Sequence, residues 1–133
     1  MSDKSILLLD DDDDDCFLFK DALNEVDHTA ELKTTNSCDQ LMTMLTEPGA
    51  QLPDLIVMDL NMPRTNGFEC LECLKVTRKL KHIPVVIFST GAEHKATDRV
   101  YDQGARECIA KPNTFGALKE IVTRLLTLDT PKA

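Results

Sequence analysis

The chain has 133 residues, a length that fits one folded domain with a single hydrophobic core and leaves no room for a second. Its composition, 42% hydrophobic and 29% charged residues, is that of an ordinary globular protein. The formal net charge of -8 argues against nucleic-acid binding, because phosphate contacts need clustered Lys and Arg. No stretch resembles a signal peptide or is apolar for long enough to span a membrane, so we expect a cytoplasmic protein that binds neither nucleic acid nor membrane.

Apolar residues recur along the chain with alternating strand and helix periodicity. The predicted strands cover residues 5–9, 30–35, 54–58, 83–88 and 107–110. Each is followed by a helical pattern, and these patterns cover about residues 18–26, 38–45, 67–80, 93–103 and 118–126. In the first of them, Leu18, Phe19, Ala22, Leu23 and Val26 form the predicted buried face. The chain therefore reads as repeated strand–helix units.

Such units with short connections predict a parallel sheet covered by helices on both faces, because right-handed crossovers place the helices outside the sheet. We expect an α/β fold, a five-stranded doubly wound sheet with the flavodoxin-like strand order 2-1-3-4-5. Ligands bind such sheets at the carboxyl ends of the strands, near the first and third. We expect one domain over residues 1–133, with a loosely ordered tail from about residue 129.

The third predicted strand, Leu55-Ile56-Val57-Met58, leads directly into Asp59. A carboxylate at this edge of the sheet favours a reactive role. A solvated Asp that caps the next helix is an equally good interpretation of this stretch alone. The residues at the ends of the other strands are needed to distinguish a reactive Asp59 from a helix-capping one.

Six consecutive Asp residues, 10–15, follow the first predicted strand. Asp12 to Asp15 fit a solvated turn at the positive end of the next helix. Asp10 and Asp11 differ, because the predicted fold places them beside Asp59, and two unit charges about 4 Å apart repel by roughly 4 kcal/mol at an effective dielectric near 20. Converging carboxylates need a counter-charge, and an all-oxygen ligand set predicts Mg²⁺ rather than zinc.

Ser89 and Thr90 follow the fourth predicted strand, and Lys111 and Pro112 follow the fifth. Singly, they are explained by a helix-capping hydroxyl and a surface Lys. Together with a metal ion, they supply the partners that the three peripheral oxygens of a phosphoryl group on Asp59 need. The sequence therefore predicts phosphoryl transfer to Asp59, and Pro112 raises the hypothesis of a cis peptide bond that orients Lys111.

The residues that carry this chemistry have a definite order and spacing: Asp10-Asp11, Met58-Asp59-Leu60-Asn61-Met62-Pro63, Gly67, Ser89 and Lys111-Pro112. This set resembles the response-regulator receiver domain of two-component signalling, in particular its stand-alone, chemotaxis-type members. The resemblance covers the chain from the first strand to the last helix. It implies that Asp59 accepts a phosphoryl group from a phosphohistidine of a sensor histidine kinase or a histidine phosphotransfer protein.

The resemblance also implies the roles of the surrounding residues. Asp11 and Asp59 would hold Mg²⁺, helped by Asp10 through water and by the backbone carbonyl of Asn61. Ser89 and Lys111 would bind the phosphoryl oxygens, with Ser89 moving toward them as the switch. The protein would then be a signalling switch that catalyses only its own phosphorylation and dephosphorylation.

Two positions depart from the family pattern. Family members carry an aromatic residue three positions before the Lys, and this sequence has Cys108 there, so we expect the switch to rely on Ser89, Thr90 and the loop that follows them. Gly91 offers no side chain to shield an acyl phosphate. We therefore expect faster loss of the phosphoryl group than in a Gly91→Arg variant.

Partner contacts are predicted at Phe17, which falls outside the apolar face of the first helix and next to the strand-end acids. An exposed aromatic residue there suits docking of a helical partner that presents its histidine; packing of Phe17 against a loop is the alternative. Output is expected by contact with, or onward phosphotransfer to, an unknown downstream protein, from a monomer or weak dimer. The connection 46–53 resembles that of regulators paired with phytochrome-like sensor kinases.

The Cys residues are odd in number and scattered, at positions 16, 38, 70, 73 and 108, which predicts reduced thiols. Cys70 and Cys73 form a C-x-x-C pattern, but they lie within a helical pattern and have no second pair at zinc spacing. A metal or redox role for them is disfavoured.

Two rival functions remain. An aspartyl-phosphate phosphohydrolase needs a second Asp two residues after its nucleophile, and Asn61 occupies that position. A phosphorylation-independent pseudo-receiver would not need the complete set of Asp11, Asp59, Ser89 and Lys111. Both are therefore disfavoured against the signalling switch.

Overall fold

The computed structural model describes residues 4–60, 67–89 and 94–128. For residues 94–97 it describes the backbone alone. The strands are β1 (Ser5–Leu9), β2 (Glu31–Thr35), β3 (Leu55–Asp59), β4 (Val85–Ser89) and β5 (Glu107–Ala110). The helices are α1 (Asp13–Val26), α2 (Cys38–Thr46), α3 (Gly67–Val76), α4 (His94–Asp102) and α5 (Phe115–Leu126). Strands and helices alternate along the chain, as predicted.

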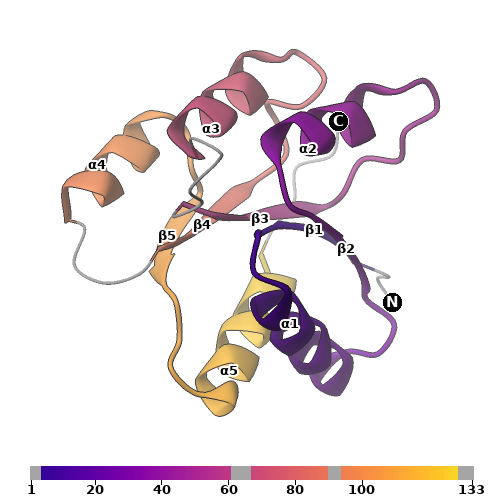
Figure 1. Ribbon diagram of the computed structural model, residues 1–133, viewed down its shortest axis with the longest axis vertical. Coiled ribbons are helices and arrows are strands. Elements are labelled where there is room, and N and C mark those ends of the chain that lie inside the picture. The colour runs from indigo at the N-terminus through magenta and orange to yellow at the C-terminus, as the bar shows by residue number, and fades with distance from the viewer. Residues whose placement is uncertain (1–3, 61–66, 90–93, 129–133) are drawn as a thin grey trace.

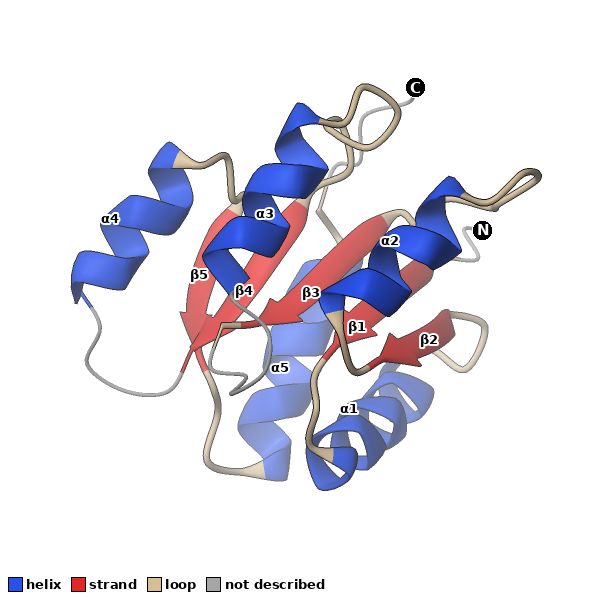
Figure 2. Ribbon diagram, turned by 45° about the horizontal axis from the view of Figure 1, so that its top comes forward, coloured by secondary structure: helices blue, strands red, loops and turns tan. Residues whose placement is uncertain are grey.

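The strands form one parallel sheet in the order β2-β1-β3-β4-β5, which confirms the predicted topology. Helices α1 and α5 cover one face of the sheet, and α2, α3 and α4 cover the other (Figures 1 and 2). Because every strand points the same way, all carboxyl ends lie along one edge of the sheet. The register pairs Asp59 with Phe88 and Ser89 with Ala110, so the last residues of β3 and β4 reach this edge.

The central strands β1, β3 and β4 are buried on both faces, which explains their nearly continuous apolar sequences. Alternate residues point to opposite sides: Ile56 and Met58 pack with α2 and α3, whereas Val57 and Leu55 pack with α1 and α5. Each fully buried aliphatic side chain stabilises the fold by about 1.5–3 kcal/mol. The sheet is therefore a rigid support for the residues at its edge.

Two helical predictions are wrong in detail. Leu18 is 48% exposed, because the buried face of α1 is narrower than predicted and consists of Phe19, Ala22 and Leu23. Helix α3 ends at Val76 rather than at residue 80. In the turn that follows, the Thr77 carbonyl accepts from the N–H groups of residues 80 and 81, and the Lys75 ammonium donates to the carbonyls of residues 81 and 83 at 3.1 and 2.9 Å.

The covalent structure corrects two further predictions. Cys38, the first residue of α2, and Cys70 in α3 form a disulfide, with Cα atoms 5.8 Å apart, so reduced thiols are found only at the other three Cys residues. The sequence pattern did not reveal that α2 and α3 lie side by side on one face of the sheet. The peptide bonds of the described residues are trans, including that before Pro112, so the cis hypothesis is wrong.

Gly104 follows the end of α4. Its φ of +101° lies in the left-handed region that favours glycine, and its N–H donates to the Tyr101 carbonyl at 3.0 Å. Among the helices of the described residues, none is both long and apolar enough to cross a membrane.

Candidate functional site

The carboxyl edge of the sheet brings together residues that are far apart in the sequence. Asp10 follows β1, Asp59 ends β3, and Lys111 follows β5. Backbone hydrogen bonds hold two of them beyond the strand ends: the Asp10 N–H donates to the Thr35 carbonyl at 3.0 Å, and the Lys111 N–H to the Ser89 carbonyl at 2.8 Å. The backbone of these three residues is therefore held in place by the sheet rather than by a loop.

Lys111 is the centre of the site. Its Nζ lies 2.7 Å from an oxygen of Asp15, 3.0 Å from one of Asp59 and 3.4 Å from one of Asp10. Burial by itself would lower the pKa of Lys111, but hydrogen bonds to Asp15 and Asp59 and the charge of Asp10 outweigh burial and raise it. The ammonium group is therefore charged at any physiological pH.

The three carboxylates that contact Lys111, those of Asp10, Asp15 and Asp59, form what we call the acidic pocket. Asp10 and Asp59 are only 4% and 3% exposed. Among the ion pairs of the described residues, one ammonium group, that of Lys111, faces these three carboxyl groups, so the described part of the pocket carries more negative than positive charge. Such an excess is costly at buried positions.

The carboxyl of Asp10 has a raised pKa. Burial raises the pKa of its carboxyl to about 6. The Asp12 N–H, which donates to Asp10 at 2.9 Å, and the Lys111 ammonium oppose the rise, whereas the charges of Asp59 and Asp15 add to it. An additional cation in the pocket would favour the ionised form of Asp10.

The acidic pocket fits a divalent cation. Each of its three carboxylates can offer one oxygen, and these oxygens all lie within 4.8 Å of one another. An all-oxygen set suits Mg²⁺ or Mn²⁺, which keep water molecules in their remaining positions. Burial, which raises the pKa of Asp10, and the charges of Asp59 and Asp15, which add to the rise, are both effects that a bound cation would oppose.

The structure distributes the Asp run differently from the sequence prediction. Asp11, predicted as a metal ligand, is exposed and is not among the three residues of the acidic pocket. Asp15, predicted to lie in solvent, reaches Lys111 from the first turn of α1. Asp12 determines this placement, because its side chain caps α1 by accepting from the N–H groups of Asp14 and Asp15.

Ser89 lies at the end of β4 and is 5% exposed. Its Oγ is 3.9 Å from the Sγ of Cys108, the position where family members carry an aromatic residue. Cys108 is partly buried and packs against the core on the α2 and α3 side. The remaining predicted site residues, Asn61, Thr90 and Gly91, lie outside the described residues.

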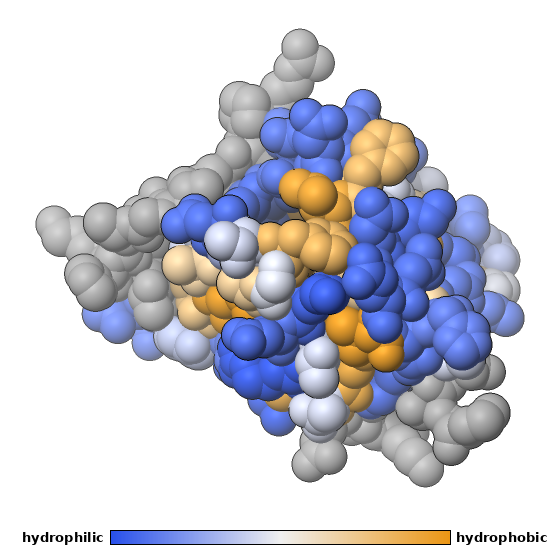
Figure 3. Space-filling view, turned by 90° about the horizontal axis from the view of Figure 1, so that it is seen from below, coloured by the Kyte–Doolittle hydropathy of each residue, from blue (hydrophilic) through white to orange (hydrophobic). Residues whose placement is uncertain are grey.

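The surface beside the acidic pocket includes exposed apolar residues of α1. Phe17 is 66% exposed and Leu18 48%, both within one turn of Asp15. Leu18, Asp15, Lys111 and Phe115 contribute to the lining of a cavity of about 120 Å³ between α1 and the start of α5. Figure 3 shows the molecule from this side, where hydrophobic patches lie among hydrophilic residues.

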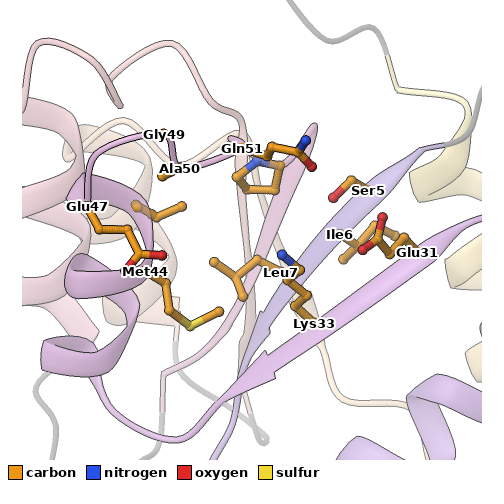
Figure 4. A pocket seen from close by; sticks show the side chains of 12 residues that line it. Ser5, Ile6, Leu7, Glu31, Lys33, Met44, Glu47, Gly49, Ala50 and Gln51 are labelled. Carbon is orange, nitrogen blue, oxygen red and sulfur yellow. The ribbon is translucent and has the colours of Figure 1, made fainter.

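A larger cavity, of about 290 Å³, lies elsewhere. Its lining includes Ser5 and Glu31, the first residues of β1 and β2, together with Lys33, Met44 and Glu47 (Figure 4). It is therefore at the amino ends of these strands, at the edge of the sheet opposite to Asp59. It is separate from the acidic pocket.

Comparison with known proteins agrees with this geometry. Residues 6–123 match the model of the response regulator receiver domain. Together with the strand order and the pocket at the carboxyl edge, this match shows that the chain belongs to the response regulator receiver family.

Individual relatives support the same assignment. The polar-differentiation response regulator DivK of Brucella anthropi is 30% identical over 109 residues, which cover 82% of this chain and 85% of DivK. The probable methanogenesis regulatory protein FilR2 of Methanothrix harundinacea is 31% identical over 77 residues, 58% of this chain and only 50% of FilR2. The chain thus matches most of DivK but spans only half the length of FilR2.

Solved structures are similar over nearly the whole chain. The phosphorylated cyanobacterial phytochrome response regulator RcpA is 31% identical with a TM-score of 0.84, and the alignment covers 93% of this chain and 91% of RcpA. The Mn²⁺-bound form of the response regulator Rcp1 is 27% identical with a TM-score of 0.84, covering 97% and 99%.

Proposed function

We propose that the protein is a phosphorylation-dependent switch in which Asp59 accepts a phosphoryl group from a phosphohistidine of a sensor histidine kinase or histidine phosphotransfer protein. The observation that carries the proposal is the buried Asp59 carboxylate, held 3.0 Å from the Lys111 ammonium inside the acidic pocket. A buried, paired carboxylate at the strand-end edge is a positioned nucleophile rather than a solvated helix cap.

In the proposed reaction, one oxygen of Asp59 forms a bond to phosphorus as the N–P bond of the donor phosphohistidine breaks. Lys111 lies close enough to move its hydrogen bond from Asp59 to a phosphoryl oxygen, which carries the negative charge after transfer. The Ser89 hydroxyl donates to a second oxygen. The site thereby stabilises charge that develops during transfer without changing the backbone of the sheet.

We further propose that Mg²⁺ is held by Asp59 with Asp10, Asp11 and the Asn61 carbonyl, and that Asp15 joins them from α1. When bound, the ion supplies the positive charge that offsets the carboxylates and the incoming phosphoryl oxygens. The Mn²⁺-bound Rcp1 structure supports a divalent cation in a related protein. The phosphorylated RcpA structure similarly supports phosphorylation of a receiver of this kind.

The proposed setting is cytoplasmic signalling by a monomer or weak dimer. The donor protein docks over Phe17 and Leu18, exposed apolar residues of α1 within one turn of Asp15. Output is by contact with a downstream protein or by onward phosphotransfer. The likeness to RcpA supports a phytochrome-like sensor kinase as the partner class.

The test is phosphorylation by a small donor, which needs no partner protein. The chain is incubated with Mg²⁺ and acetyl phosphate and analysed by intact mass at short times, alongside Asp59→Asn and Asp21→Asn. Asp21 is an exposed Asp of α1 and serves as the matched control. We expect one phosphoryl adduct in wild type and Asp21→Asn and none in Asp59→Asn. An adduct in Asp59→Asn, or none in wild type, contradicts the proposal.

A further inference from the structure

Tyr101, on α4, contacts the strand at the edge of the sheet. Its hydroxyl oxygen accepts a hydrogen bond of 3.0 Å from the backbone N–H of Cys108 in β5. Because β5 is an edge strand, a donor on its outer side has no neighbouring strand to bond to. The Tyr101 hydroxyl therefore satisfies a backbone group and ties α4 to β5.

The side chain of Cys108 points toward the site. Its Sγ is 3.9 Å from the buried Ser89 hydroxyl. Register explains this proximity: Cys108 pairs with Ile87, so it lies on the same face of the sheet as Ile87 and Ser89. Two successive contacts thus connect Ser89, at the edge where Asp59 lies, with Tyr101, a residue that is 45% exposed.

Other residues of α4 attach the helix to the core and to α3. Val100 is fully buried, and the Arg99 guanidinium lies 3.8 Å from the centre of the Phe68 ring in α3. These contacts hold the inner side of α4, whereas the Tyr101 hydroxyl bonds to β5. A small shift of β5 at Cys108 therefore changes the environment of the Tyr101 hydroxyl, to which the Cys108 N–H donates.

We infer that Tyr101, linked to Ser89 through Cys108, is the residue that reports the state of Asp59 on the outer surface of α4. The inference rests on the proposed function. A Ser89 hydroxyl that donates to a phosphoryl oxygen turns its Oγ toward that oxygen and away from the Cys108 sulfur, whichever of the two atoms donates in their 3.9 Å contact. The Ser89–Cys108 contact is replaced, Cys108 shifts, and the hydrogen bond between its N–H and Tyr101 is altered.

The composition of the chain offers a direct readout. Tyr101 is the only Tyr and there is no Trp, so intrinsic tyrosine fluorescence comes from this residue alone. Wild type is treated with Mg²⁺ and acetyl phosphate, and emission and intact mass are measured on the same samples. We expect the emission to change in proportion to the adduct, and to stay constant in Asp59→Asn.

Two variants test the path. Cys108→Ala removes the sulfur that faces Ser89, and we expect it to form adduct but to lose most of the emission change. Cys73→Ala, the same change at an exposed Cys of α3, is the control that keeps the full change. Tyr101→Phe keeps the ring but not the hydroxyl, and we expect the amide proton of Cys108, followed by NMR, to lose its phosphorylation-dependent shift.

The possible outcomes distinguish a failure of this inference from a failure of the proposed function. A full adduct in wild type with unchanged Tyr101 emission and an unchanged Cys108 amide overturns the inference and leaves the proposed function intact. A full emission change in Cys108→Ala also overturns it, because the path would not pass through the sulfur. Absence of adduct in wild type overturns the proposed function and the inference with it.

Discussion

Replacing Asp10 by Asn should stabilise the protein at neutral and alkaline pH when no divalent cation is present. Burial raises the pKa of Asp10 from 3.8 to about 6, so the folded state holds this proton more tightly than the unfolded state. Above about pH 6 the folded protein contains an ionised carboxylate in an unfavourable place, and it loses stability relative to a neutral residue of the same shape.

The size of the effect follows from the two pKa values. At about 1.4 kcal/mol per pH unit, their difference corresponds to at most about 3 kcal/mol. Water at the edge of the pocket reduces this, and we expect Asp10→Asn to gain about 1–2 kcal/mol. The gain is complete above about pH 6, shrinks as the pH falls from about 6 to 3.8, and disappears below that range.

The assay is urea unfolding in EDTA between pH 4.5 and pH 8, with Asp21→Asn as the exposed control. Mg²⁺ should then stabilise wild type more than Asp10→Asn and so reduce or reverse the gain, because the ion favours the ionised carboxylate. Equal stability of wild type and Asp10→Asn at pH 8 in EDTA would refute the electrostatic argument. A gain that increases toward low pH would refute it as well.

Three other changes test the same structure. Lys111→Met should lower the free energy of unfolding by about 2–4 kcal/mol without a divalent cation, and Mg²⁺ should restore part of it; urea curves that do not move would argue against the ion pairs. Asp15→Asn should weaken Mg²⁺ binding by about tenfold in calorimetry. The neighbouring exposed Asp14→Asn should not, and equal affinities in the two variants would exclude Asp15 from the metal site. Thiol titration of the denatured chain should find three free thiols, rising to five after reduction of Cys38–Cys70, with a loss of about 2–4 kcal/mol in stability. Five thiols without reductant would show that the disulfide is absent.

Much of the fold could be predicted because the hydrophobic pattern of a parallel sheet is strong. Strands such as β3 are buried on both faces and therefore read as unbroken apolar runs. The strand order followed from the number of units and their short connections. Helix ends were less predictable: Leu80 was predicted to end α3, but it is buried from the turn after the helix, where its N–H donates to the Thr77 carbonyl.

Site residues at the ends of strands could be predicted from the sequence, whereas the site residue on a helix could not. Asp10, Asp59 and Lys111 each stand at a strand end, and the structure places them in contact. Asp15 was missed because six identical acids give no sign of which one points inward. The start of α1, which Asp12 caps, determines which Asp side chain faces the pocket. In the folded chain it is Asp15, whose carboxylate lies within hydrogen-bond distance of Lys111.

The most direct test of the central claim is to locate the phosphoryl group. Wild type is phosphorylated with acetyl phosphate and Mg²⁺ and reduced with borohydride, which converts an aspartyl phosphate to homoserine, and its peptides are then sequenced by mass spectrometry. Our account predicts homoserine at position 59 and at no other Asp, including the adjacent carboxylates of Asp10 and Asp15. Homoserine at either of those positions, or unmodified Asp59 in a chain that carries the adduct, would contradict it.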